Sequence, residues 1–459
     1  MKIIFPYSDH IATLDNVEFK QGEAVKHGEP LIVPEHPWEG VLTYLYGSVV
    51  KTTLYRMWYQ AHGVYVAYAR SRDGIQWEKP LFDGLAVEHP RVGPTVESAE
   101  GGELCAVPAP QRSLKSNVVL DFHMPTVIED PADRARPYKL FGYTNRGYGA
   151  AFSQDGVHFK SAEANPVIPL LKFPAQINRK TWYSDVAPVF MDARTGKFVS
   201  HVKTYECDDV GRIRRCVGRS ESDDFIHWTE PTAIWTPDAD DDRLARERGF
   251  EWADFYGLCG FNYGEGYLGL LWLFFIDYEI ERGTHEGKIE VFLAGSPDGR
   301  RWKRLSDAPL IPLSSTGWDT GMITTASQPL FLDDGIRLYY GGANFSHGVG
   351  EAGNDYDAQS HRFCIGLATL RRDGFVYAWA THGRLATTSM ESKKGRLKIN
   401  ADCTAGKIIV EIVQADRKVK SFTLAGIDDT EHTLDMAVKG RVVLDITLES
   451  ARLYSVEVV

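Results

Sequence analysis

Short apolar and aromatic runs, separated by turn residues, recur along most of the chain. The stronger runs are Leu54–Gln60, Tyr138–Tyr143, Phe198–Tyr205, Tyr267–Phe275 and Ile336–Tyr340. A segment ending in a turn precedes most of them, and a shorter apolar run follows each. Runs of this kind, bounded by turn residues and almost without helical periodicity, are typical of strands. The pattern therefore predicts three or four strands in each of five repeats.

The same turn follows each group of strands. It reads S-R-D-G-I-Q-W from Ser71, S-Q-D-G-V-H-F from Ser153, S-D-D-F-I-H-W from Ser222, S-P-D-G-R-R-W from Ser296 and, more loosely, T-L-R-R-D-G-F from Thr369. In each copy, Ser or Thr and Asp can hydrogen-bond the turn backbone, while Gly accepts a positive φ. The copies lie 82, 69, 74 and 73 residues apart. This long, regular period favours radial repetition, and we predict a five-bladed β-propeller over residues 1–383, with an N-terminal strand as the candidate to close the last blade.

The remainder of the chain has a different pattern. From about Gly383 the aromatic content falls, and short alternating runs such as K-I-I-V-E-I-V and R-V-V-L-D-I-T-L take over. We predict a small antiparallel β-sandwich over residues 384–459, with charges such as Glu411 and Asp445 facing solvent. The fold class predicted for the whole chain is all-β.

Composition and charge argue against some classes of binding partner, nucleic acid and membranes among them. The 51 Lys and Arg residues are outnumbered by 62 Asp and Glu, so the net charge of −11 gives no field that would attract nucleic acid or anionic membranes. The longest apolar stretch, Tyr267–Ile276, is too short to cross a bilayer. The N-terminus breaks at Pro6 and lacks the apolar core of a secretory signal, so we expect a cytoplasmic protein. Six scattered Cys without a C-x-x-C motif are expected to be reduced thiols: residues 105, 207, 216, 259, 364 and 403.

An acid beside an aromatic residue recurs just before the first strand of each repeat. The five sites are Trp38-Glu39, Asp121-Phe122-His123, Trp182-Tyr183-Ser184-Asp185, Trp252-Ala253-Asp254 and Trp318-Asp319. In a propeller the first strands surround the axis, so we expect these acids and Trp side chains to meet at one mouth of the channel. Paired carboxylates and Trp faces are what cleavage of a glycosidic bond requires.

The repeated turn, the five blades and the trailing sandwich resemble the five-bladed propeller glycoside hydrolases of families 43, 32, 68, 62 and 117, and the related family 130. Phrases such as Y-A-R-S-R-D-G-I-Q-W-E-K-P and I-G-L-A-T-L-R-R-D-G-F-V are most similar to proteins described as resembling the family 32 N-terminal domain. The resemblance implies a base or nucleophile at Glu39, a supporting Asp121 and an acid at Asp185. Those families usually have Asp in blade one and Glu in blade three, and here the two residue types are exchanged. Glu206 and His123 are therefore alternative candidates for the catalytic acid.

Other polar residues are candidates for binding the hydroxyls, a carboxylate or a phosphate of a substrate. They are Arg146, Lys203 and His347, and with the Trp residues, His123, Glu206, Asp254 and Asp319 they complete the predicted substrate-binding set. Nucleotide-binding glycine motifs are absent from the sequence. No cofactor is expected to be required; a structural divalent cation in the channel and a homo-oligomer stay open.

The leading hypothesis is a glycosidase acting on a small glycan or oligosaccharide, with a furanoside as one candidate. Two alternatives remain. A glycoside phosphorylase resembling family 130 would need a cationic phosphate site beside a lone acid, for which Lys203, Arg146 and His347 are the candidates. A carbohydrate-binding propeller without activity would keep the Trp residues but not the convergent acids.

Overall fold

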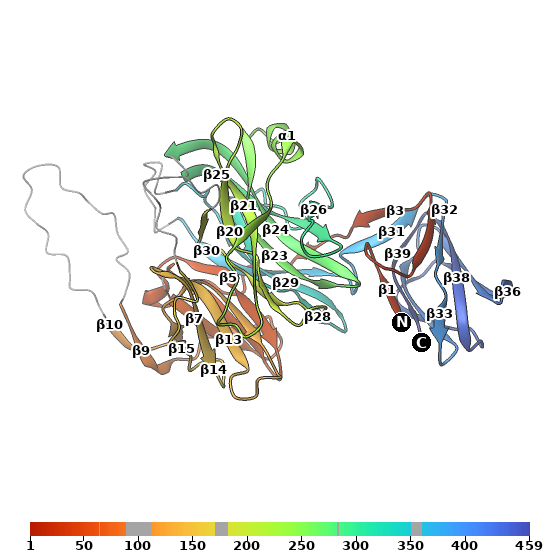
Figure 1. The fold of residues 1–459 in the computed structure, drawn as a ribbon, viewed down its shortest axis with the longest axis horizontal. Coiled ribbons are helices and arrows are strands. Elements are labelled where there is room, and N and C mark those ends of the chain that lie inside the picture. Colours follow the sequence, from red (N-terminus) through yellow and green to blue (C-terminus); the bar gives the residue numbers. More distant parts are fainter. Residues whose placement is uncertain (64, 89–111, 170–181, 282–283, 350–359) are drawn as a thin grey trace, which may run out of the picture.

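The computed structural model describes residues 1–63, 65–88, 112–169, 182–281, 284–349 and 360–459. These residues form two lobes, a larger ring of sheets and a smaller pair of sheets that carries both chain ends (Figure 1). Helical structure in the described residues is confined to α1 (Ala239–Glu247) and the short 3-10 helix η1 (Pro37–Glu39). The all-β prediction is confirmed.

The larger lobe follows the predicted repeats. The first two sheets hold β5 (Thr43–Lys51), β6 (Tyr55–Ala61), β7 (Tyr65–Ser71), β8 (Trp77–Glu78) and β11 (Val118–Leu120), and then β12 (His123–Glu129), β13 (Tyr138–Thr144), β14 (Gly147–Ser153), β15 (Lys160–Ser161) and β16 (Ile168–Pro169). The third holds β17 (Trp182–Ser184), β18 (Val189–Met191), β19 (Phe198–Ser200), β20 (Lys203–Cys207), β21 (Ile213–Ser222) and β22 (Thr232–Trp235). A separate hairpin, β9 (Phe82–Glu88) with β10 (Arg112–Ser116), is inserted between β8 and β11 of the first sheet.

The last two groups of strands share one continuous sheet. They hold β23 (Trp252–Tyr263), β24 (Gly266–Glu281), β25 (Thr284–Ser296) and β26 (Lys303–Arg304), and then β27 (Met322–Thr325), β28 (Leu330–Leu332), β29 (Gly335–Ala343), β30 (Phe363–Leu370) and β4 (Val25–Lys26). The strand that closes the last blade is therefore β4, which pairs with β30 through Lys26 and Ala368.

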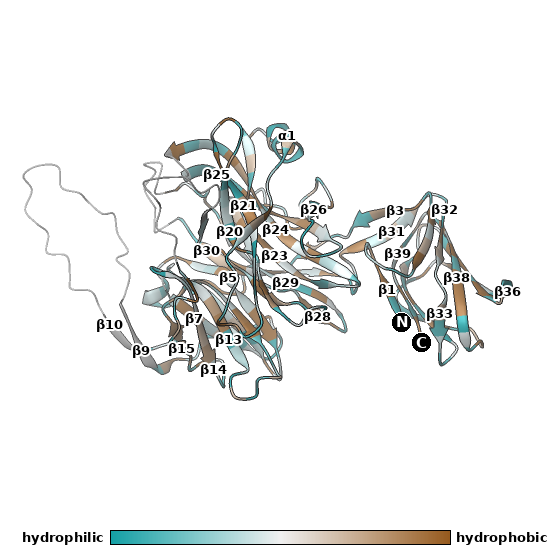
Figure 2. Cartoon of the chain, in the orientation of Figure 1, coloured by the Kyte–Doolittle hydropathy of each residue, from teal (hydrophilic) through white to brown (hydrophobic). Residues whose placement is uncertain are grey.

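Contacts between the innermost strands close a ring. Among the described residues, β5 packs beside β12, β12 beside β18, β18 beside β23, β24 and β25 beside β27, and β27 beside β5. This closed order is that of a propeller, and its five groups of strands follow the five predicted repeats, which we call blades. Arginines link neighbouring blades: Arg56 donates to the carbonyl of Asp155 at 2.5 Å, and Arg337 of the fifth blade donates to that of Asp73 in the first at 2.5 Å. The strands are apolar where blades pack together (Figure 2).

The repeated turn has the predicted hydrogen bonds in four copies. In the first, Ser71 Oγ accepts from Gly74 N at 2.8 Å, and Asp73 Oδ1 accepts from Ile75 N and Gln76 N at 2.8 Å. The copies that begin at Ser153, Ser222 and Ser296 repeat this arrangement. In the third copy Phe225 replaces Gly and adopts φ 69°, a conformation that a bulky residue rarely takes. Its ring is fully buried beside Phe198, at a centroid distance of 5.0 Å, and this burial offsets the strain.

The fifth copy binds the small lobe instead. Asp373 receives hydrogen bonds from Lys2 Nζ at 2.8 Å and Ser455 Oγ at 2.7 Å. Both partners belong to strands of the small lobe, so this turn ties the last blade to its neighbour.

These turns predict a loss of stability in acid. Partial burial opposes ionisation of Asp155 and Asp224, but hydrogen bonds from a histidine and from backbone amides hold the pKa of each carboxyl well below 3.8. A carboxyl with a depressed pKa stabilises the fold above its unfolded pKa, and that contribution is lost as the pH falls toward its folded pKa. We expect the free energy of unfolding in urea to decline below about pH 4. Asp155→Asn should remove part of that decline, and an identical decline in the variant would contradict this origin.

The small lobe is the predicted sandwich, with different boundaries. Its sheets run β3-β31-β39-β34-β37 with β1 beside β39, and β2-β32-β38-β35-β36 with β33 beside β38. The strands are β1 (Lys2–Ile4), β2 (Ile11–Asp15), β3 (Glu18–Gln21), β31 (Val376–Ala380), β32 (Gly383–Thr387), β33 (Met390–Ser392), β34 (Arg396–Asp402), β35 (Lys407–Gln414), β36 (Arg417–Ala425), β37 (Asp428–Asp435), β38 (Gly440–Glu449) and β39 (Ala451–Val458). Their inward residues, Ile408, Val410, Leu444 and Ile446, are fully buried.

The sheets therefore correct the expected division at residue 383. Strands β1 to β3 and β31 belong to the sandwich, so the propeller lies between the two flanks of the chain rather than before a boundary. The physical reason is that pairing partners such as Lys2 and Glu457 lie far apart in sequence, and a three-residue strand does not reveal its partner.

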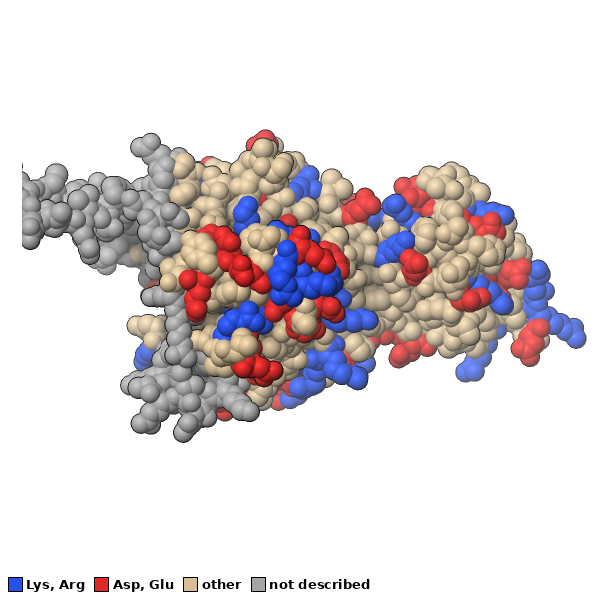
Figure 3. Space-filling view, turned by 90° about the horizontal axis from the view of Figure 1, so that it is seen from above, with Lys and Arg blue, Asp and Glu red and all other residues tan. Residues whose placement is uncertain are grey.

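The surface carries charged side chains of both signs. On the face shown in Figure 3, acidic and basic side chains lie intermixed rather than in a patch of one sign. No helix in the described residues is long and apolar enough to span a bilayer. Five of the six cysteines are free thiols, and Cys105 lies outside the described residues.

Candidate functional site

A buried ion pair joins the end of β17 to the start of β20 in the third group of strands. Asp185 stands just before β18 with φ 21°, and Lys203 begins β20. Lys203 Nζ lies 2.7 Å from Asp185 Oδ1, which also accepts hydrogen bonds from Ser184 Oγ and Val186 N at 2.9 Å each. The Lys203 side chain is 3% exposed and that of Asp185 24%, so the carboxylate is the more accessible partner.

Side chains from the other blades gather around this pair. The charge of Asp185 acts to raise the pKa of four of them: Tyr46 of β5, His123 of β12, Tyr256 of β23 and His347 after β29. Lys203 Nζ stands 4.3 Å from the ring centroid of Tyr256. All five blades thus contribute a polar side chain to one cluster, which we call the mouth cluster.

The electrostatics of the mouth cluster set its protonation. Burial alone would raise the pKa of Asp185, but the charge and hydrogen bond of Lys203 lower it to about 2. The same pairing overcomes burial and raises the pKa of Lys203. Burial lowers the pKa of His123, and burial together with the charge of Arg215 lowers that of His347 to about 3. At neutral pH the cluster therefore holds a carboxylate, an ammonium group and two neutral imidazoles.

The acid of the first blade is held elsewhere. Glu39 is fully buried in η1, where it accepts hydrogen bonds from Tyr59 Oη at 2.5 Å and from the amides of Glu35 and His36 at 2.7 and 2.9 Å. Lys79 Nζ completes its surroundings at 3.0 Å. Its neighbour Trp38 is also buried. These contacts make Glu39 an anchor for the loop.

The acids of the fourth and fifth blades have their own partners. Asp254 is fully buried between Arg214 Nε at 2.9 Å and Arg215 Nη1 at 3.5 Å. Asp319, which is 2% exposed, accepts from Lys26 Nζ at 2.7 Å and Tyr340 Oη at 3.0 Å.

The other predicted residues are either exposed or have local partners of their own. Trp318 stacks on Tyr340, Trp252 packs edge-on against His285, Asp121 and Arg146 are exposed, and Glu206 accepts from Thr236 Oγ1 at 3.3 Å. The side chain of Trp182 lies outside the described residues.

The described contacts give the five predicted acids different partners, and their gathering in one cavity stays a prediction. Among the described contacts, Asp185, His123, Lys203 and His347 come together, while Glu39, Asp254 and Asp319 have separate cationic partners. Sequence reasoning missed Tyr46, Tyr256, Arg215 and His285. The adjacent Arg214-Arg215 within an apolar run was the available signal, because two arginines inside a strand require buried acids.

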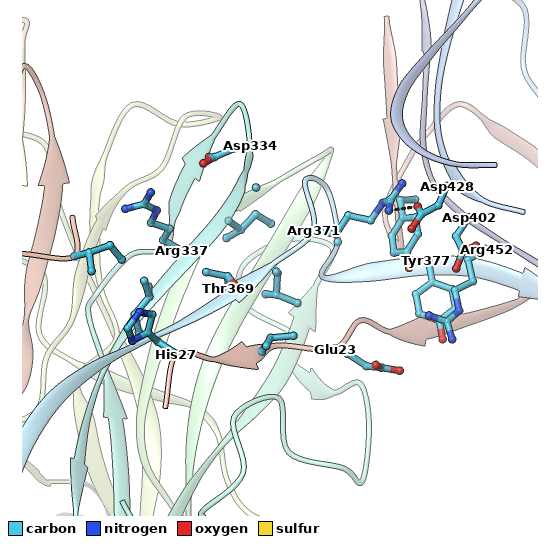
Figure 4. Close-up of a pocket in the computed structure, with 18 residues that line it drawn as sticks. Glu23, His27, Asp334, Arg337, Thr369, Arg371, Tyr377, Asp402, Asp428 and Arg452 are labelled. Atoms are coloured by element: carbon cyan, nitrogen blue, oxygen red, sulfur yellow. Dashed lines mark hydrogen bonds and ion pairs between the residues drawn. The ribbon is translucent and has the colours of Figure 1, made fainter. Parts of the chain in front are cut away.

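No group of three or more His, Cys, Asp or Glu side chains in the described residues is arranged to hold a metal ion. A separate pocket of about 570 Å³ lies at the junction of the lobes, between the last blade and the sandwich. Figure 4 shows Arg337 and His27 on the propeller side, and Arg371 reaching Asp428 on the other. Its arginines and aspartates are of mixed sign, and it contains none of the mouth cluster.

No protein-family model matches the chain, and no curated protein matches it. Solved structures of carbohydrate-processing enzymes resemble it in fold. A thermostable family-43 glycoside hydrolase aligns over 78% of this chain and 95% of its own, with 13% identity and a TM-score of 0.44. A GH32 β-fructofuranosidase from Bombyx mori aligns over 93% of each chain, with 12% identity and a TM-score of 0.40. An N-acetylgalactosamine deacetylase from F. plautii aligns over 80% of this chain and 92% of its own, with 15% identity and a TM-score of 0.43.

Proposed function

We propose that the chain is a glycoside hydrolase that binds its sugar at the mouth cluster. The observation that carries the proposal is the Asp185–Lys203 pair, surrounded by a side chain from each other blade. A partly exposed carboxylate beside the anomeric carbon favours the positively charged transition state of glycoside cleavage or attacks that carbon. The partly exposed ring of Tyr46 offers a face for a sugar ring.

The protonation states alter the roles that the family resemblance implied. With a pKa of about 2, Asp185 is suited to act as a carboxylate and not as the proton donor. His123 Nδ1 lies 2.6 Å from the carbonyl oxygen of Gly63, which only accepts, so Nδ1 carries the proton. Its Nε2 can then take a proton from the attacking water and pass it to the leaving oxygen. We assign proton transfer to His123 and the charged role to Asp185.

A specific observation also favours phosphorolysis as the second candidate. The three candidates for a phosphate site are Lys203, His347 and Arg146. The first two belong to the mouth cluster, whereas Arg146 is exposed in a turn. The positive charge of Arg215 acts to lower the pKa of both Lys203 and His347. In a phosphorylase, phosphate replaces water as the attacking group, so one carboxyl is enough.

Replacing Asp185 by Asn tests both candidates. Because the substitution removes the charge with little change in shape, turnover should fall by about 10³-fold or more. It also leaves the buried Lys203 without its anion and lowers stability, so circular dichroism first confirms that the variant is folded. The assay measures release from aryl furanosides and pyranosides, with and without inorganic phosphate. Dependence on phosphate would select the phosphorylase.

Glu163→Gln, an amide substitution at an exposed position, is the matched control and should leave turnover unchanged. Full activity in Asp185→Asn would refute the assignment of Asp185. Binding of oligosaccharides by a parent protein that cleaves none of the panel would instead support a carbohydrate-binding propeller. The cytoplasmic location and a homo-oligomeric state stay predictions.

A further inference from the structure

A chain of buried polar contacts runs from α1 to the mouth cluster. Arg214 Nη2 lies 2.8 Å from Asp242 Oδ1 on α1, and Arg214 Nε lies 2.9 Å from Asp254 Oδ1. The other oxygen of Asp254 faces Arg215 at 3.5 Å, and Arg215 Nη1 reaches His285 Nδ1 at 2.5 Å. These side chains are 12% exposed or less. Buried charges of this kind are weak evidence for stability, because desolvation cancels much of their attraction.

The chain of contacts ends at His347. The β24–β25 hairpin supplies two carbonyl oxygens to this residue: that of Gly287 accepts from His347 N at 3.0 Å, and that of His285 accepts from His347 Nδ1 at 3.1 Å. The imidazole packs between Tyr256 and Phe274, at centroid distances of 5.2 and 4.8 Å. The guanidinium of Arg215 lies over the same Phe274 ring at 5.1 Å.

These contacts fix the tautomers of two histidines. A carbonyl oxygen only accepts, so His347 Nδ1 carries the proton and Nε2 is the nitrogen available to a substrate. An arginine only donates, so His285 Nδ1 is the acceptor and its proton sits on Nε2. We propose that Arg215 and His285 are positioning residues that hold His347 with Nε2 as a hydrogen-bond acceptor for a substrate hydroxyl, and that Asp254 acts only through Arg215.

The part of this inference that concerns substrate rests on the proposed function, but the arrangement of His347 does not. The charged and titratable groups near His347 are Arg215, Lys203, Asp185, His285 and Tyr256, and Glu286 lies beside the neighbouring Gly348. Burial and Arg215 keep the ring neutral, with a pKa of about 3. Loss of Arg215 removes a nearby positive charge and the donor to His285, so His347 should take up a proton more readily.

Side-chain nitrogen NMR of the full chain tests the arrangement without any substrate. We expect the parent His347, assigned with His347→Gln, to show the neutral Nδ1–H tautomer from pH 8 to about 4, and His285 the Nε2–H tautomer. In Arg215→Gln, the pKa of His347 should move toward its ordinary value of about 6.5. Arg219→Gln is the matched control, because this buried arginine of the same strand bonds Gly299 and Glu221 instead.

The outcomes separate the two proposals. An Nε2–H tautomer of His347 in the parent, or an unchanged His347 titration in Arg215→Gln, would overturn the positioning role whatever the activity assay gives. The parent measurement does not need Arg215→Gln, so the test stands even if that variant fails to fold. If the parent is active, kcat/KM should fall about 10- to 100-fold in Arg215→Gln and recover little in Arg215→Lys, which lacks the planar donors. Expected NMR results with an inactive parent would leave the positioning role intact and count against the proposed function alone.

Discussion

Lys203→Met is expected to cost about 3 kcal/mol of folding stability and to raise the pKa of Asp185, because it leaves a largely buried carboxylate without its cation. In the parent, the depressed pKa of about 2 means that Asp185 stabilises the fold above about pH 4 and that this contribution fades as the pH falls below it. In the variant, the carboxyl gains a proton at higher pH. The acid limb of the kcat/KM profile should therefore move upward.

The double variant Lys203→Met/Asp185→Asn is the control, since it removes both charges. Urea unfolding at pH 7 should show that the double variant recovers part of the stability lost in the single one. A single variant as stable as the parent would show that the pair contributes nothing to folding, and an unmoved acid limb would remove Asp185 from the reaction.

Removal of residues 381–459 is expected to prevent formation of the native propeller. The deletion takes away β39, which pairs with both β1 and β31, and β32, which pairs with β2. The remaining N-terminal strands of the sandwich keep few partners, and the closure of the last blade then depends on β4 and the residues that follow it, which bond to β30. Lost near-ultraviolet circular dichroism and a low soluble yield would report this result.

A chain reduced to residues 23–372 is the informative companion, because it removes both flanks together. If this chain unfolds cooperatively at the parent's midpoint, the sandwich is an independent lobe and the expectation is wrong. If it also fails to fold, closure of the ring depends on the sandwich.

The repeated elements could be predicted because their causes are local. The Ser-x-Asp-Gly turn forms from hydrogen bonds within four or five residues, so each copy is visible in sequence. The same periodicity singled out Asp185 and His123 as positions beside the first strand of a repeat.

The partners of the other acids depended on distant residues and could not be predicted. Glu39 meets Lys79, which is 40 residues away, and Asp319 meets Lys26 from the closing strand of the same blade, nearly 300 residues away. An acid beside a Trp has the same appearance in sequence whether it faces a substrate or a lysine. The same limit applied to the sandwich, whose N-terminal strands are too short to indicate their partners.

The pairing of β4 with β30 also imposes a delay during synthesis. Val25 and Thr369 are neighbours in the finished fold, but about 340 residues of chain separate them. At ordinary translation rates of about 5–20 residues per second, β4 stays unpaired for roughly 20 to 70 seconds before β30 has been synthesised. During that time blades one to four lack a closed ring, and the apolar edge of the first blade has no neighbour from the fifth. Yield in the cell should therefore depend on how well this open intermediate is shielded, more than on the stability of the closed ring.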